Sequence, residues 1–381
     1  MNLTNKSILK IKNYLIMKYK IGFIIEQALG HITHGKNLKE NMRLDPEIEA
    51  FWGLPRQPES GLMALPGIRN WTLQAGLQAN SAIRKMASAG NKPDILFFHT
   101  QVTAILARKW MSQIPSVVSL DATPIQYDSL GEFYAHESGP AWLENFKFNL
   151  NQACYTRASH LVAWSEWTRE SLIKDYDVNG DKITVIPPGV NVADWQSPED
   201  SQEHSDQPLR ILFVGGDLKR KGGDDLLQAF SAAKAELGNT QIELHLATRS
   251  RPQPAEGVFV YNDMQANSPE LKALYHQADM FCLPTYGDCL PMVLSEAAAT
   301  GLPLISTNVA AIPEIVRPGQ SGILVKPGDV QAIKEAIIGL AKNPAERKRM
   351  GQTALQQTTQ NFDAQANAIR LFNLLKQTVQ N

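Results

Sequence analysis

The sequence predicts an α/β protein with two doubly wound parallel sheets, and three features of the chain indicate this. Short apolar runs recur, and a turn and a helical pattern follow each of them. Most runs lack alternation of apolar and polar residues, which is typical of strands buried on both faces of a parallel sheet. A polar segment divides the runs into two series, and a chain of 381 residues is long enough for two domains.

Nine apolar runs are the predicted strands. The first series comprises KIGFII (20–25), DILFFHT (94–100), SVVSLD (116–121) and HLVAWS (160–165). The second comprises RILFVGG (210–216), IELHLAT (242–248), GVFVYND (257–263), DMFCLPT (279–285) and PLISTN (303–308). Because helical patterns separate the strands, each series predicts βαβ units and a Rossmann-like sheet. Such sheets bind ligands beyond the carboxyl ends of their strands, so the residues after each strand are candidates for a site.

The linker and the chain ends set the predicted domain boundaries. Residues 195–208 are polar and acidic and contain two prolines, so we predict a linker between an N-terminal domain over 20–194 and a C-terminal domain over 209–360. Residues 361–381 predict a helix, and its packing against the N-terminal domain is left open. The expected apolar face of this helix is Ile369, Leu371, Phe372, Leu374 and Leu375.

Residues 1–19 are predicted to be an extension in which lysines alternate with Ile and Leu. We expect either a solvated extension or a translation start at Met17, and a basic helix on a membrane surface is the alternative. The signal-peptide pattern is absent, and no apolar run reaches about 18 residues.

The bulk composition is that of an ordinary globular protein, with 43% apolar and 20% charged residues. A formal net charge of -1 gives no reason to expect a nucleic acid partner. Three irregularly spaced cysteines, Cys154, Cys282 and Cys289, predict neither a disulfide framework nor a zinc site. We therefore expect a cytoplasmic protein, with peripheral contact at the inner face of a membrane as an option.

Two strands of the first series are followed by polar residues. The segment EQALGHITHGKN (26–37) is predicted to be a loop, in which Gln27 and His31 offer polar groups and Gly30 permits close approach of the backbone to a ligand. His99 stands near the end of the DILFFHT strand, where contact with a substrate and a purely structural role are about equally expected.

The second series has a cationic turn after its first strand. Lys219, Arg220 and Lys221 precede two glycines and the helical pattern DDLLQAFSAAKAEL, which together predict a site for an anion at a helix N-terminus. Neither GxGxxG nor GxxxxGK[ST] is present, so this is not a standard dinucleotide or phosphate loop.

The stretch GDCLPMVLSEAAATGLP (287–303) places Asp288 in a loop and Glu296 inside a helix that Pro291 is expected to open. Carboxylates eight positions apart are poorly placed to share a metal. They suit two hydroxyl-bearing parts of an extended ligand, with the helix N-terminus between them at a phosphate.

These motifs together give the chain a family resemblance. From Lys20 onward it resembles the GT-B glycosyltransferases of family 4, which are retaining enzymes that use nucleotide sugars. The family's E-x7-E motif falls on Asp288 and Glu296, and its VGR-L-x-x-x-KG segment falls on 214–222 with Lys221 at the lysine position. Segments 158–172, 184–195 and 309–329 are also similar. The chain departs from the pattern at Asp288, which is one methylene shorter than glutamate, and at Gly216, which replaces an arginine; Arg220 could replace that cation.

The resemblance implies two domains facing across a cleft and a retaining transfer from a UDP- or GDP-sugar to a glycan or lipid-linked acceptor, without a metal or cofactor. It implies donor binding by Gly216, Arg220, Lys221, Asp288, Leu290, Met292 and Glu296. Within this set, Glu296 would hold the ribose and Asp288 the sugar, while Lys221 with Arg220 and the N–H groups around Leu290 and Met292 would stabilise the diphosphate. His99, together with Lys221 and Asp288, is expected to be catalytic, and Gln27, Gly30 and His31 are expected to bind the acceptor.

Two alternatives remain at this point. The first is a sugar-nucleotide epimerase of the same fold, which needs no acceptor. The second is a catalytically inactive scaffold that binds a nucleotide or a partner protein, because Asp288 and Gly216 both depart from the family pattern.

Overall fold

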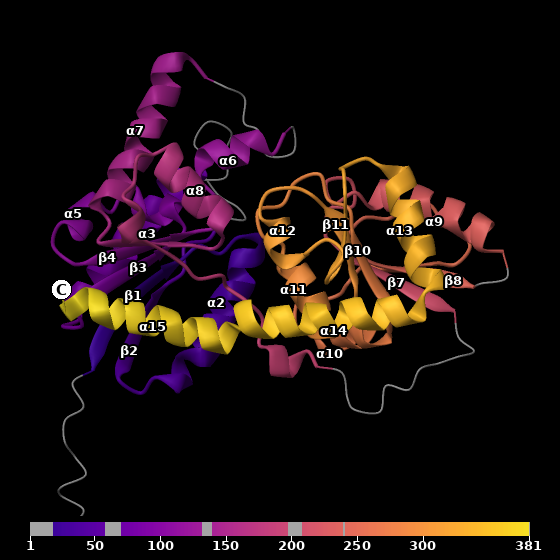
Figure 1. The fold of residues 1–381 in the computed structure, drawn as a ribbon. Helices are drawn as coiled ribbons and strands as arrows, with labels where there is room; N and C mark the ends of the chain where they lie inside the picture. The colour runs from indigo at the N-terminus through magenta and orange to yellow at the C-terminus, as the bar shows by residue number, and fades with distance from the viewer. Residues whose placement is uncertain (1–17, 58–69, 132–138, 197–207, 239–240, 381) are drawn as a thin grey trace, which may run out of the picture. The chain divides into compact units, whose positions relative to one another are not determined.

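The computed structural model describes residues 18–57, 70–131, 139–196, 208–238 and 241–380. The described strands form two six-stranded sheets, ordered β2-β1-β3-β4-β5-β6 and β12-β11-β10-β7-β8-β9 (Figure 1). The first sheet comprises β1 (Tyr19–Ile25), β2 (Ile48–Gly53), β3 (Ile95–His99), β4 (Ser116–Leu120), β5 (His160–Ala163) and β6 (Ile183–Val185). The second comprises β7 (Leu209–Val214), β8 (Ile242–Ala247), β9 (Val258–Tyr261), β10 (Met280–Leu283), β11 (Leu304–Thr307) and β12 (Gly322–Val325).

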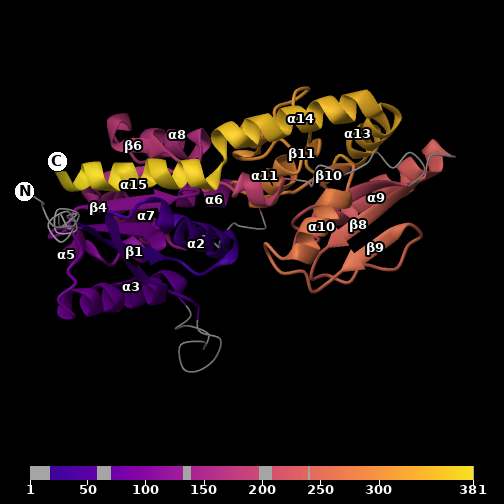
Figure 2. The ribbon, with the colours of Figure 1, turned by 90° about the horizontal axis from the view of Figure 1, so that it is seen from below.

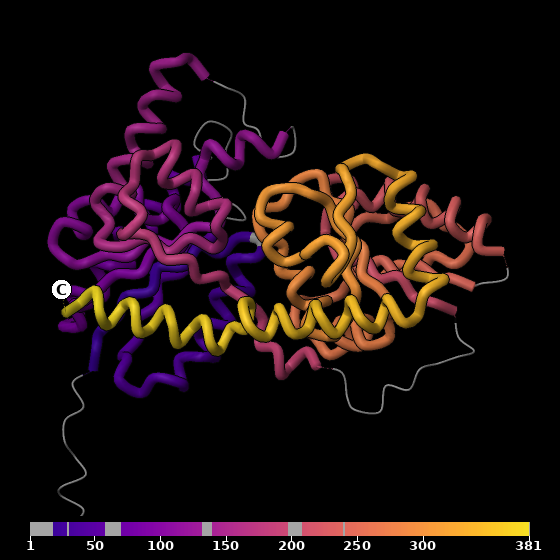
Figure 3. The backbone as a smooth tube through the Cα atoms, in the orientation of Figure 1, coloured from indigo at the N-terminus to yellow at the C-terminus, as the bar shows by residue number. Residues whose placement is uncertain are grey.

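Helices connect most of the strands, and Figure 3 allows the course of the backbone to be followed through both sheets. The earlier helices are α2 (Leu29–Asn41), α3 (Trp71–Ser88), α4 (Gln101–Ala104), α5 (Arg108–Met111), α6 (Pro124–Ser129), α7 (Ala141–Arg157) and α8 (Glu166–Lys174). The later ones are α9 (Gly223–Leu237), α10 (Pro269–Gln277), α11 (Met292–Ala299), α12 (Ile312–Ile315), α13 (Val330–Lys342), α14 (Pro344–Asn361) and α15 (Ala364–Gln380). Short 3₁₀ turns lie at Met42–Leu44, Gly180–Lys182 and Val192–Asp194.

All nine predicted strands are confirmed, with ends that differ from the predicted runs by at most two residues, and the predicted pair of Rossmann-like sheets is correct. The apolar runs did not predict β2, β6 and β12. Strand β2 lies at the edge of its sheet and is only partly buried, so its sequence IEAFWG mixes polar and apolar residues. Strand β6 has three residues, which is too short for an apolar run to stand out. The four-residue β12, GILV, is as long as β10 and β11 and was overlooked.

The segment 26–37 was wrongly predicted to be a loop, because it contains most of α2. Polar residues dominate the buried face of this helix, so the sequence lacks the apolar periodicity of an amphipathic helix. That face is formed by His34, Gly35, Asn37, Leu38 and Asn41. Gly30 lies in the first turn of α2, is exposed, and a Cβ there would meet no atom within 4 Å. No described part of the chain therefore requires glycine at this position, and close approach to a ligand there stays a prediction.

Each sheet has a point at which the strand order reverses. In the first sheet this point lies between β1 and β3, and in the second it lies between β7 and β10. All the strand pairs with a described register are parallel. In doubly wound sheets the crevice at this reversal is where ligands bind, so the residues after these four strands define the regions to inspect.

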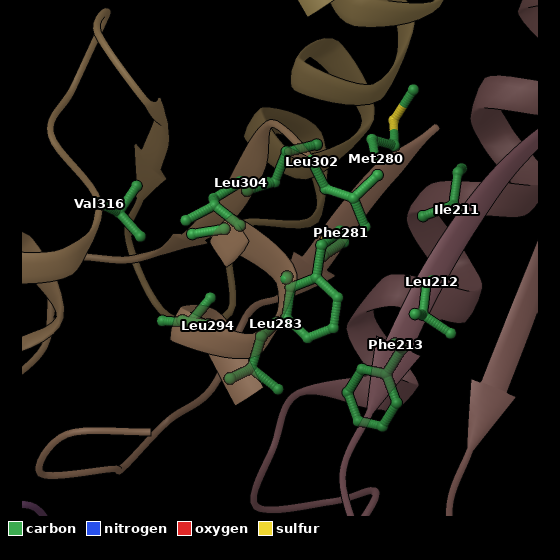
Figure 4. Close-up of a cluster of buried hydrophobic side chains, with 14 of the residues drawn as sticks. Ile211, Leu212, Phe213, Met280, Phe281, Leu283, Leu294, Leu302, Leu304 and Val316 are labelled. Atoms are coloured by element: carbon green, nitrogen blue, oxygen red, sulfur yellow. The ribbon is translucent and has the colours of Figure 1, made fainter. Parts of the chain in front are cut away.

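The core of the second sheet is apolar on both of its faces. Helices α9 and α13 pack on each other, α10 contacts β7, and α11 contacts β10 and β11 (Figure 2). Figure 4 shows the side chains around β10, where Phe281 and Leu283 lie with residues of β7 and α11 that are all buried. These neighbours are Ile211, Leu212, Phe213 and Leu294. Strands buried on both faces explain why the sequence shows unbroken apolar runs.

The chain forms two compact units. The first contains residues 1–119, 150–161 and 368–381, and the second contains 120–149 and 162–367. Within the first unit, α15 is anchored near β1 and β2, because Lys376 pairs with Asp45 at 2.7 Å and Gln380 donates to the Tyr19 hydroxyl. Ile369 was wrongly placed on the apolar face of this helix, since 45% of its surface is exposed, while Leu371, Phe372 and Leu375 are buried as expected.

Two predicted segments lie largely outside the described residues. These are the extension over 1–19, of which only the last two residues are described, and the linker over 195–208. Among the described helices, none combines the length and apolar character needed to cross a bilayer.

Candidate functional site

The turn after β7 reaches the end of β10 because of a glycine. Gly222 has φ of 71°, and a Cβ on it would stand 2.0 Å from the Pro284 carbonyl oxygen. Only a residue without a Cβ can adopt this conformation at such close approach. The KGG sequence therefore brings the two cations before Gly222 to the loop that follows β10, which is the reversal point of the second sheet.

An ion-pair network joins these cations to the loop acid. The Lys221 Nζ donates to Asp288 Oδ2 at 2.6 Å, and the Arg220 Nη1 lies 3.3 Å from Asp288 Oδ1. Thr285 also donates its hydroxyl to Asp288 Oδ2, at 2.9 Å. The three charged side chains are only 11–14% exposed. Partial burial strengthens such pairs. Asp288 therefore holds both cations in place beside the carboxyl ends of β7 and β10, where the strand order reverses.

The charges of this network nearly cancel within the protein. Arg220 also lies 3.7 Å from Asp217, so two cations face two carboxylates. The Arg220 guanidinium donates further to the Gly287 carbonyl at 2.8 Å. Gly287 and Asp288 hold Arg220 toward the loop that follows β10.

Helix α11 begins one residue later than expected, at Met292, with Pro291 as its N-cap. No acceptor within the described parts of the chain takes the N–H groups of Leu290, Met292 or Val293. Free N–H groups at a helix start suit an anion, so these groups can receive a phosphate beside the Lys221–Asp288 pair.

Glu296 lies in the second turn of α11 and is 5% exposed. Its Oε2 accepts a hydrogen bond of 2.9 Å from the hydroxyl of Tyr275, which lies on α10. Burial raises the pKa of Glu296 to about 7, against the opposing effects of Tyr275 and Lys272. A carboxylate that is hidden and poorly stabilised in this way gains from a ligand that brings hydroxyl donors to it.

We expect Glu296→Gln to change stability in a pH-dependent way. Since the folded-state pKa of Glu296 lies above its unfolded value, the folded wild type loses stability as pH rises from about 4.5 through about 7. Glutamine does not ionise. The free energy of unfolding of the variant should therefore rise by about 2 to 3 kcal/mol relative to that of the wild type between pH 5 and pH 8. Urea unfolding of both proteins at pH 5 and pH 8 measures this change. If the stability difference between variant and wild type were the same at both pH values, Glu296 would not have a raised pKa.

The second predicted cluster lies in the first unit, at the ends of β1 and β3. Glu26 is 6% exposed and accepts hydrogen bonds from the Thr100 hydroxyl at 2.7 Å and the Trp71 indole N–H at 2.5 Å. Gln27 is half-buried, and its side-chain amide donates to the carbonyl of Ile25 at 3.2 Å. This arrangement places a carboxylate, an amide and an indole together at the reversal point of the first sheet.

Three histidines complete this first-unit cluster. His99 Nε2 lies 2.8 Å from His31 Nδ1, and the ring of His34 packs 5.1 Å from the ring of His99. Burial and the neighbouring histidines lower the pKa of His99 well below its usual value, and the pKa of His34 to about 3. His99 has no exposed surface, so it cannot touch a ligand directly as expected. His31 is the partly exposed ring, and His99 orients it.

Several site residues were absent from the predicted set. Glu26 and Thr100 directly follow strands, so the strand-end rule could have identified them. Thr285 also ends the predicted run 279–285. Tyr275 carries no such signal, because it lies within α10 and meets Glu296 only through tertiary packing.

Two family models match most of the chain. Residues 44–194 match the model described as Glycosyltransferase Family 4, and residues 208–343 match the model described as Glycosyl transferases group 1. A curated glycogen synthase of Mycobacterium tuberculosis is 24% identical over 312 residues, which are 78% of this chain and 73% of that protein. A putative teichuronic acid biosynthesis glycosyltransferase of Bacillus subtilis is 25% identical and covers 89% of this chain and 85% of its own length.

Solved structures share the fold. A sucrose-phosphate synthase from Thermosynechococcus elongatus superposes with a TM-score of 0.75 at 17% identity, covering 94% of this chain and 99% of that one. HepE from Anabaena, solved in complex with UDP-glucose, superposes with a TM-score of 0.68 at 14% identity and covers 94% of this chain and 99% of its own.

Proposed function

Because the chain belongs to the GT-B glycosyltransferases of family 4 and group 1, we propose that it transfers a sugar from a UDP- or GDP-sugar to a hydroxyl of a glycan or lipid-linked acceptor. One observation carries the donor assignment. Lys221, Arg220 and Asp288 converge at the reversal point of the second sheet, beside the free N–H groups that open α11. Cations and N–H groups together suit a diphosphate.

The order of contacts along the donor follows from the positions of the two acids. Glu296, inside α11, would accept hydrogen bonds from the ribose, and the start of α11 with Lys221 would hold the diphosphate. Asp288 lies beyond the helix start and would contact the sugar. HepE, which shares this fold, was solved in complex with UDP-glucose, and this supports a donor of the same class.

The proposed chemistry is a retaining transfer through an oxocarbenium-like state. As the bond from sugar to diphosphate breaks, negative charge grows on the leaving oxygens, and fixed donors in a dry site stabilise it strongly. Asp288 is engaged on both of its oxygens by Arg220, Lys221 and Thr285, so it is poorly suited to attack the sugar as a nucleophile. The acceptor hydroxyl then bonds to the anomeric carbon on the face that the diphosphate leaves and gives its proton to a departing phosphate oxygen, which accounts for retention.

Acceptor binding is assigned to the first-unit cluster, in which Gln27 and His31 are partly exposed and the buried His99 orients the His31 ring. Depressed pKa values keep the buried rings of His34 and His99 neutral at physiological pH, so neither adds a positive charge beside the His31 ring. The likeness to a putative teichuronic acid biosynthesis glycosyltransferase supports a glycan acceptor.

A thermal-shift panel tests the donor assignment. The protein is heated with UDP- and GDP-sugars, with bare UDP and GDP, and with uridine and guanosine as controls that lack phosphate. A ligand at 100 times its Kd should stabilise the native state by about 2.7 kcal/mol, and only compounds with a diphosphate should do so. Equal shifts with the nucleosides, or no shift with any compound, would contradict the proposal.

Turnover assays separate the remaining functions. Release of nucleoside diphosphate that depends on an added acceptor indicates transfer, whereas an epimerase would convert the nucleotide sugar to its epimer without an acceptor and without net release of the diphosphate. Retention is then read from the anomeric configuration of the product by NMR.

A further inference from the structure

The guanidinium of Arg249 lies beside the position that a Cβ at Gly216 would take. It follows β8 by two residues and is exposed. A Cβ built on Gly216 would stand 3.3 Å from Arg249 Nε and 3.6 Å from Nη2. The guanidinium thus lies against the backbone turn that follows β7, and a Cβ at Gly216 would require it to shift by a few tenths of an ångström.

Hydrogen bonds fix the loop that carries Arg249. The Asn262 side-chain amide donates to the carbonyls on either side of it, Thr248 at 3.0 Å and Ser250 at 2.8 Å. The Ser250 hydroxyl also accepts from the Leu218 N–H at 3.3 Å, which ties this loop to the turn after β7. A cation on an anchored loop loses little freedom when it binds a ligand.

Lys221 contacts the same turn. A Cβ on Gly215 would stand 3.0 Å from Lys221 Cγ, while the neighbouring Gly216 lies against Arg249. The two cations therefore flank a Gly-Gly dipeptide that has no side chains to shield it.

The cations near this turn differ in whether a carboxylate of the protein already pairs with them. Arg220 and Lys221 are matched by Asp217 and Asp288. Arg249 makes no ion pair or hydrogen bond with any residue that the structure describes. Lys219 is also exposed without a described side-chain partner, but no contact places its ammonium on the Gly215–Gly216 turn.

We propose that Arg249 binds the diphosphate of the donor together with Lys221, and that Gly216 serves to admit its guanidinium. This inference rests on the proposed function and names a further residue of the same site. It replaces the expectation that Arg220 substitutes for a cation at position 216, since Arg220 is held by Asp288 and the Gly287 carbonyl. The planar guanidinium can bind two phosphate oxygens at once, which lysine cannot do.

Calorimetric titration with bare UDP and GDP tests this assignment. Arg249→Met should weaken binding of whichever diphosphate the wild type prefers by about tenfold or more. Binding of the matching nucleoside should not change, because it lacks phosphate. Arg251→Met is the matched control, since Arg251 is exposed in the same loop two residues further on, and it should leave the affinity within about twofold.

A variant that moves the arginine to another position shows whether a loss of diphosphate binding is due to misfolding. Gly216→Arg alone should crowd Arg249 and weaken binding, whereas Gly216→Arg combined with Arg249→Gly returns a guanidinium to the turn from the other strand. The double variant should bind the diphosphate more tightly than Arg249→Gly alone.

The outcomes separate the two proposals. If the wild type binds neither diphosphate, the proposed function fails and this inference fails with it. If the wild type binds one and Arg249→Met binds it equally well, or if Lys219→Met alone causes the loss, only the role of Arg249 is overturned.

Discussion

Replacing Lys221 with methionine should lower kcat by roughly 10²- to 10³-fold, with a smaller change in the KM for the donor. This is the range measured when one fixed donor to a developing negative charge is removed. Lys221 is 12% exposed and reaches the Asp288 carboxylate at 2.6 Å, so its ammonium is held at the reversal point rather than in solvent. The charge on the departing diphosphate is greatest in the transition state, and the loss therefore appears mainly in kcat.

Steady-state and single-turnover kinetics with the preferred nucleotide sugar measure this effect. Lys219→Met is the control, because Lys219 is an exposed cation of the same turn and should change kcat by less than about threefold. A Lys221→Met enzyme with an unchanged kcat and a raised KM would assign Lys221 to ground-state binding only.

Replacing Asp288 with asparagine should also reduce kcat strongly, by an expected tenfold to hundredfold. The carboxylate accepts from Lys221, Arg220 and Thr285, and asparagine keeps one oxygen that can accept these bonds but loses the negative charge that would face the sugar as positive charge grows there. In contrast, affinity for a bare nucleoside diphosphate should stay equal or rise slightly, since a negative charge near the phosphates has been removed.

Asp288→Glu tests whether the shorter side chain matters. It keeps the charge and lengthens the side chain by one methylene, so it should retain more activity than asparagine and can shift the preference among donor sugars. If glutamate and asparagine were equally damaging, the position of the carboxylate would matter more than its charge.

The sequence predicted most of the strands and the proximity of Lys221 to Asp288, for reasons that are local. Strands buried on both faces give unbroken apolar runs, and Lys221 and Asp288 each follow such a run, so strand order alone brings them together. The close approach at Gly222 could also be suspected, because two glycines precede the helix.

The features that were missed depend on contacts between distant segments. Helix α2 buries histidines and asparagines instead of an apolar stripe, which hides its helical period. Arg249 meets Gly216 only because β8 pairs with β7, and Tyr275 meets Glu296 only through packing of α10 near α11. The burial of His99 likewise follows from α2 covering the end of β3 with His31 and His34.

The order of the two acids along the donor is the central claim, and titration of the bare nucleoside diphosphate at pH 8 tests it most directly. At that pH the Glu296 carboxylate is ionised, because its pKa is raised only to about 7. Glu296→Gln should weaken binding by roughly 1.5 to 3 kcal/mol through loss of a charge-assisted bond to the ribose. Asp288→Asn should bind at least as tightly as the wild type, since the ligand carries no sugar. Equal weakening by both substitutions, or an effect of Asp288→Asn alone, would contradict the proposed order.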